Sequence, residues 1–173
     1  MELPGSSYLY TLSMVSITFV GFSALLVVMR QAKGGGLTNY DTYFTLSFIQ
    51  IGFLVTASGL VPPVFASFDW SATVVWHVSS TVVALPILWF VARVPARRRA
   101  ATGMPVPVFV AALLSVQATA AAVLLLNATG AFSRPGAVYV AAVTVVLFAS
   151  GVAYLLALTV ILPVLGDGDA GGR

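Results

Sequence analysis

One apolar stretch of the chain, residues 71–92, is interrupted by polar side chains at helical spacing. In a helix, one face would carry Thr73, His77, Ser80 and Thr81. Pro86 follows, and a proline deprives the carbonyl four residues earlier of its helical donor. An imidazole, hydroxyls and an unpaired carbonyl suit the wall of a water-filled path or of a ligand pocket. The alternative is packing, in which His77 contacts a neighbouring helix or a headgroup and the hydroxyls bond to their own helix.

Two amide side chains lie near the middle of other apolar stretches, Gln50 within residues 43–66 and Gln117 within residues 105–127. An amide in a bilayer is costly unless it is hydrogen-bonded. The simplest expectation is a contact between Gln50 and Gln117, or a contact of each with its symmetry mate in an oligomer. Contact with a solute is the other interpretation, so both are candidates for a pore-facing or ligand-facing site.

The residues that are missing from the sequence exclude many kinds of chemistry. The chain has no cysteine and one histidine, which excludes thiolate nucleophiles, thiolate metal sites and a two-histidine haem site. No Asp, Glu, Lys or Arg lies inside an apolar stretch, which argues against a carboxylate proton relay and an arginine voltage sensor. We therefore predict no catalytic residues, no metal and no cofactor, in a protein that is not an enzyme.

Five long apolar segments must position these side chains. The sequence is 60% hydrophobic and 8% charged. Each segment reaches the ~20 residues that a helix needs to cross ~30 Å of hydrocarbon. The segments are residues 8–29, 43–66, 71–92, 105–127 and 137–162. We predict an all-α integral membrane protein, a compact bundle of five transmembrane helices in a single domain over residues 1–165, followed by a disordered tail at 166–173.

The basic residues indicate an orientation. Arg30, Lys33 and the group from Arg93 to Arg99 lie on one side of a five-span bundle together with Arg173, whereas Arg134 lies on the other. The positive-inside rule then places the N-terminus outside and the C-terminus in the cytoplasm. We expect a multi-pass protein of the cell membrane, the inner membrane if the source is bacterial. In a four-span alternative residues 71–92 are re-entrant, which would move the arginine group outside.

The most basic connection contains Arg97, Arg98 and Arg99. It is predicted to anchor the orientation, and the same positive field suits contact with anionic lipid headgroups. The other basic residues are scattered over several segment ends and form no basic face, so the chain is not expected to bind nucleic acid.

Small residues at helical spacing predict where the helices pack, because lipid-embedded helices associate by close approach of their backbones. These positions are Thr45, Gly52, Thr56 and Gly59 in the second segment, Ala111, Ser115, Ala118 and Ala122 in the fourth, and Ala149, Ala153 and Ala157 in the fifth. The contacts could lie within one bundle or between subunits. Pro62 and Pro63 are expected to bend or end the second helix.

Three functions are compatible with these features. The first is a non-enzymatic, oligomeric passive channel for a small neutral solute or a weakly selected ion, based on the polar third segment. The second is an accessory or assembly subunit of a larger membrane complex, based on the small-residue stripes. The third is a lipid-modifying membrane enzyme. The expected partners are the lipid bilayer and either further copies of the chain or a larger membrane complex.

Overall fold

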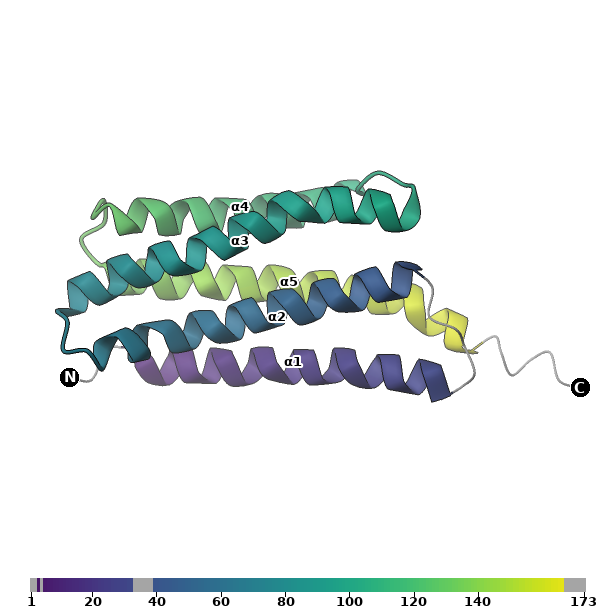
Figure 1. The fold of residues 1–173 in the computed structure, drawn as a ribbon, viewed down its shortest axis with the longest axis horizontal. Coiled ribbons are helices and arrows are strands. Elements are labelled where there is room, and N and C mark those ends of the chain that lie inside the picture. The colour runs from purple at the N-terminus through teal and green to yellow at the C-terminus, as the bar shows by residue number, and fades with distance from the viewer. Residues whose placement is uncertain (1–2, 4, 33–38, 167–173) are drawn as a thin grey trace, which may run out of the picture.

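The computed structural model describes residues 3, 5–32 and 39–166. Of the disordered tail predicted at residues 166–173, Gly166 instead ends the last helix, and residues 167–173 lie outside the described residues. Five helices run alternately in opposite directions (Figure 1). They are α1 (Ser6–Ala32), α2 (Asn39–Ala66), α3 (Ala72–Thr102), α4 (Val108–Ala128) and α5 (Pro135–Gly166). All five are long and apolar enough to cross a membrane, and the described residues contain no strand. The all-helical fold with five candidate membrane spans is thus confirmed.

The helix α5 occupies the centre of the bundle. It contacts each of the other four helices, while α1 packs on α2, α2 on α3 and α3 on α4. Among the described residues α2 and α4 do not contact each other. We call the end of the bundle where α3 ends and α4 begins the basic end; it lies at the right of Figure 1.

The helix α3 extends well beyond the predicted end at residue 92. It begins after the N-cap Ser71, whose side chain accepts a hydrogen bond from the backbone of Val74, and ends before the C-cap Gly103, which has φ 68°. The arginines from Arg93 to Arg99 therefore lie on this helix, and the prediction that Arg97, Arg98 and Arg99 belong to a connection was wrong. Hydropathy marks where a segment stops being apolar, whereas Arg and Ala are strong helix formers and continue the helix.

The helices α1 and α2 are held together by small residues. A Cβ added to Gly52 would meet the Val20 side chain, and one added to Gly59 would lie 2.6 Å from the carbonyl oxygen of Leu9. The Ser16 hydroxyl donates to the Gly52 carbonyl at 2.8 Å. The two backbones approach so closely because neither glycine has a side chain to separate them.

Packing at the other predicted positions differs from helix to helix. The side chains of Ala111, Ser115 and Ala122 on α4 are exposed, and α4 instead buries a face that contains Gln117, Ala120, Ala121, Leu124 and Asn127. On α5, Ala149 is buried and Ala153 is half-buried, whereas the Ala157 side chain lies outside the described residues. Thr45 and Thr56 on α2 and Ala118 on α4 are half-buried. The α4 stripe therefore faces away from this chain's own core.

A tyrosine on α5 compensates for a proline within α2. Pro62 lies inside α2, which continues to Ala66, and it cannot donate to the carbonyl of Ser58 four residues earlier. The hydroxyl of Tyr139 donates to that carbonyl at 2.6 Å. The Tyr139 ring also packs on Trp76 of α3, with ring centroids 5.4 Å apart. One side chain thus satisfies a carbonyl that the proline leaves free and joins three helices.

We expect Tyr139→Phe to destabilise the protein by about 1 kcal/mol, because the Ser58 carbonyl would lose its donor while the ring against Trp76 is kept. The measurement is the free energy of unfolding in mixed micelles under increasing denaturing detergent. Tyr8→Phe is the matched control, since the Tyr8 hydroxyl lies at an exposed contact 3.2 Å from Thr144. Equal effects of the two substitutions would contradict the role assigned to Tyr139.

Candidate functional site

A cavity of about 330 Å³ lies toward the basic end, between α2, α3, α4 and α5. Its volume is at the lower end of the ~300–1,000 Å³ typical of small-molecule sites. The walls are mainly aromatic and aliphatic, and include Phe44, Phe48, Phe90, Phe109, Leu113 and Leu114. The cavity exists because α2 and α4 do not meet, so that side chains from four helices surround the space between them. We refer to it as the α2–α5 pocket.

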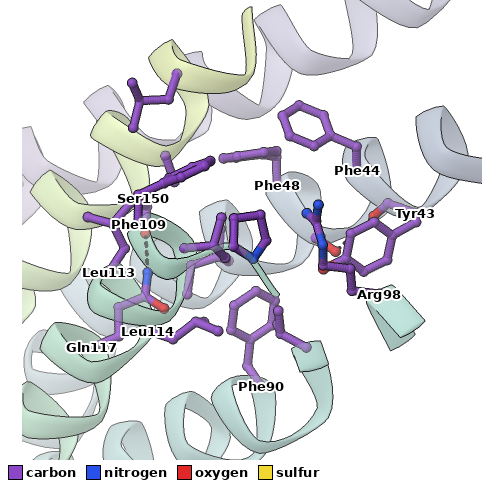
Figure 2. Close-up of a pocket in the computed structure, with 17 residues that line it drawn as sticks. Tyr43, Phe44, Phe48, Phe90, Arg98, Phe109, Leu113, Leu114, Gln117 and Ser150 are labelled. Atoms are coloured by element: carbon purple, nitrogen blue, oxygen red, sulfur yellow. Dashed lines mark hydrogen bonds between the residues drawn. The ribbon is translucent and has the colours of Figure 1, made fainter. Parts of the chain in front are cut away.

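The polar groups of the α2–α5 pocket lie at its two ends. Figure 2 shows Arg98 beside Tyr43 on one side of the lining residues, and Gln117 with Ser150 on the other. Along α3, the helical rise from Phe90 to Arg98 is about 12 Å. One leaflet of a bilayer contributes about half of a hydrocarbon core ~30 Å thick. The length of the pocket is therefore similar to the thickness of a single leaflet. We call the end with Arg98, which is nearer the basic end of the bundle, the outer end of the pocket, and the end with Gln117 its inner end.

Among the described residues, Arg98 is the one charged side chain that lines the α2–α5 pocket. It is half-buried near the end of α3, and its Nε has no hydrogen-bond partner among the described residues. A guanidinium offers its N–H donors in a planar fork that matches a carboxylate or phosphate. Arg98 can therefore bind an anion at the outer end of an apolar cavity.

The neighbouring arginines are directed elsewhere. Arg97 donates to the Oε1 of Gln50 at 2.6 Å, and its guanidinium lies 5.4 Å from the ring centroid of Trp89. The guanidinium of Arg93 lies over the same ring at 4.8 Å. Arg99 is exposed and does not line the pocket. Of the predicted lipid-contact cluster, Arg98 alone combines a basic group with a cavity.

At the inner end of the pocket, Gln117 and Ser150 form a hydrogen-bonded pair. The Ser150 hydroxyl donates to the Val146 carbonyl at 2.7 Å and accepts from the Gln117 Nε2 at 3.0 Å. Gln117 is only 4% exposed, and its Oε1 has no partner among the described residues. Gln117 thus lines this end of the pocket and carries a buried acceptor without a partner among the described residues.

The expected contact between Gln50 and Gln117 is not formed. Gln50 accepts from Arg97 of α3, and Gln117 donates to Ser150 of α5. The sequence placed each amide within an apolar segment but did not give the directions in which the two side chains point. The helix that each amide faces depends on rotation within the bundle, which the sequence did not reveal.

The polar residues of the third segment do not gather at the α2–α5 pocket. Thr73 and Thr81 are exposed, His77 and Pro86 are half-buried, and none of them lines it. Thr81 bonds to the His77 carbonyl of its own helix. Ser80 is buried, donates to the Trp76 carbonyl at 2.7 Å and accepts from Asn127 at 2.9 Å. The hydroxyls of Ser80 and Thr81 thus have partners within the bundle or on α3 itself.

Sequence reasoning missed most of the pocket. Phe44 and Phe48 are one helical turn apart on α2, with ring centroids 4.5 Å apart, but aromatic pairs are common in apolar segments and gave no distinct signal. Ser150 and Phe109 were likewise not singled out. Gln117 was identified because its polarity is unusual at its depth, and Arg98 because it belongs to a cluster.

The chain matches no protein-family model, no curated protein and no solved structure. Within the described residues, no group of three or more His, Asp or Glu side chains is placed to hold a metal ion.

Proposed function

We propose that this chain is a non-enzymatic, multi-pass membrane protein that binds a single-chain anionic amphiphile, such as a fatty acid, in the α2–α5 pocket. The observation that carries the proposal is the combination of a leaflet-deep apolar cavity with Arg98 at its outer end. The aromatic and aliphatic walls suit an alkyl chain, and the guanidinium suits a carboxylate. The volume of about 330 Å³ favours one chain over the two chains of a phospholipid.

The proposed orientation follows from charge. The basic end carries Arg93, Arg97, Arg98 and Arg99 on α3, and the positive-inside rule favours such an end in the cytoplasm. The amphiphile would then enter from the inner leaflet, and its charged group would meet Arg98 at headgroup level. Trp89 is 50% exposed beside Arg93 and Arg97, as suits an aromatic anchor at a membrane interface.

The test is photo-crosslinking of a diazirine-bearing fatty acid to the protein in phosphatidylcholine nanodiscs, followed by peptide mapping. We expect labelling of residues that line the pocket, such as Phe48 and Leu113. Leu113→Trp should reduce this labelling to less than half, because the larger ring fills the cavity. Val116→Trp is the matched control on the same helix, since Val116 is exposed and does not line the pocket.

Two results would overturn the proposal. One is labelling spread over the exposed faces of all helices with none concentrated at the pocket. The other is equal labelling of wild type and Leu113→Trp, with both variants shown to be folded by their unfolding transitions.

An accessory or assembly subunit is the second candidate function. It is supported by the exposed stripe of Ala111, Ser115 and Ala122 on α4, which has no partner helix within the described part of this chain. Small residues allow another transmembrane helix to approach closely. The mass and subunit composition of the particle in nanodiscs test it: a stoichiometric second chain supports this candidate, and a single protomer contradicts it. The placement of Thr73, Ser80 and Thr81 gives the passive-channel hypothesis no comparable support.

A further inference from the structure

The inner end of the α2–α5 pocket has its own hydrogen-bonding requirement. A serine hydroxyl has a single proton, and that of Ser150 is directed to the Val146 carbonyl. Ser150 can therefore act only as an acceptor toward Gln117, so the amide must present its N–H group, as observed at 3.0 Å. This pairing sets the orientation of the Gln117 amide, with its nitrogen toward Ser150 and its oxygen directed away from Ser150.

The oxygen of Gln117 is consequently held as an acceptor that lacks a donor. The side chain is 4% exposed, and Oε1 has no partner in the described part of the chain. Figure 2 shows the amide nitrogen toward Ser150 and the oxygen toward the other residues that line the pocket. A buried carbonyl oxygen without a hydrogen bond is unfavourable, so a ligand that brings a donor to this depth gains affinity.

The two ends of the pocket thus require different groups on one ligand. Arg98 offers a cationic group at the outer end, and Gln117 carries an acceptor without a donor at the inner end. Along α4, the helical rise between the lining residues Phe109 and Gln117 is about 12 Å, so the two groups must be separated by an extended chain. A hydroxyl provides the donor without adding a carbonyl acceptor that would need a partner of its own.

We propose that the preferred ligand is an anionic amphiphile with a hydroxyl at the end of its chain remote from the charge, and that Gln117 recognises this hydroxyl. This inference rests on the proposed function, because it assumes that the chain of an anionic amphiphile occupies the pocket. It adds a specificity determinant, the Gln117 Oε1, held in position by Ser150.

The experiment compares dodecanoate with ω-hydroxydodecanoate as competitors of the photo-crosslinking fatty acid in phosphatidylcholine nanodiscs, at equal concentrations in the membrane. We expect the hydroxylated competitor to be about three- to tenfold more effective on wild type, the range for one neutral hydrogen bond. Gln117→Met should abolish this preference while still binding dodecanoate. Gln50→Met is the matched control and should keep the preference, because Gln50 does not line the pocket.

A second variant keeps the inference testable if Gln117→Met fails to fold. Ser150→Ala removes the acceptor that orients the amide, so the preference for the hydroxyl should fall toward unity. Equal competition by both compounds on wild type would overturn the inference, as expected if a water molecule satisfies Gln117, and would leave the proposed function standing. Failure of both compounds to compete would overturn the proposed function itself.

Discussion

Arg98→Gln is expected to weaken binding of a fatty acid anion by about tenfold or more. A charge-assisted hydrogen bond in a partly buried site contributes about 1.5–3 kcal/mol, and glutamine offers neither the charge nor the planar fork of donors. Arg98 lines the α2–α5 pocket, and its Nε is buried with no partner in the described part of the bundle, so its loss breaks no hydrogen bond made by that atom. Competition against the photo-crosslinking fatty acid in nanodiscs measures the effect.

Arg99→Gln is the matched control for this experiment. It removes the same charge from the next residue of α3, but Arg99 is exposed and lies outside the pocket lining. Its general electrostatic attraction for anions is screened by salt, so we expect less than a threefold change at physiological ionic strength. A fatty alcohol of the same chain length should bind equally to wild type and Arg98→Gln. If both arginine variants weakened binding of the anion equally, the result would indicate attraction to a diffuse basic surface and would contradict a specific site at Arg98.

Gly59→Ala is expected to destabilise the bundle by about 2 kcal/mol, the cost of overpacking at a rigid contact. The new Cβ would lie 2.6 Å from the Leu9 carbonyl oxygen and closer still to the Ser13 hydroxyl. The Leu9 oxygen is backbone and cannot move without shifting α1 as a whole. The hydrogen bond from Ser13 to the Thr56 carbonyl, 3.0 Å long, should be lost with the displacement. Detergent-induced unfolding measures the loss of stability.

Gly21→Ala is the control, because a Cβ at Gly21 meets nothing within 4 Å. Alanine is favoured over glycine in a helix by up to about 1 kcal/mol, so this variant should be neutral or slightly stabilising. The same substitution is thus expected to destabilise the bundle at Gly59 and to leave its stability unchanged or slightly increased at Gly21. A stabilising Gly59→Ala would show that α1 and α2 are not held at the distance described here.

The number and type of the helices could be predicted because each segment carries its own evidence. About 20 consecutive apolar residues satisfy their backbone hydrogen bonds locally and match the hydrocarbon thickness, so no knowledge of neighbours is needed. The end of α3 was less predictable. The prediction stopped at residue 92, where the apolar character falls, but the helix continues through Pro95 and the arginines to Thr102 and ends at the left-handed Gly103.

Contacts between helices were harder to predict than the helices themselves. Gly52 and Gly59 proved to lie against α1 within the chain, whereas Ala111 and Ser115, of the same small-residue pattern, are exposed. Spacing shows which residues share a face but not what that face meets. In lipid this ambiguity is larger than in water, because an apolar environment surrounds the helix on every side and hydropathy does not mark the buried face.

The sequence by itself determined an all-helical chain with five candidate membrane spans, the side of the bundle on which positive charge collects, and a polar Gln117 in the middle of an apolar segment. Only the tertiary structure decided that Arg98 and Gln117 lie at opposite ends of one cavity, that Gln50 pairs with Arg97, and that Tyr139 replaces the donor missing at Pro62. The physical reason is that helix formation and membrane insertion depend on local sequence. A pocket depends on the rotation and separation of four helices, which are set by side-chain packing among residues far apart in the chain.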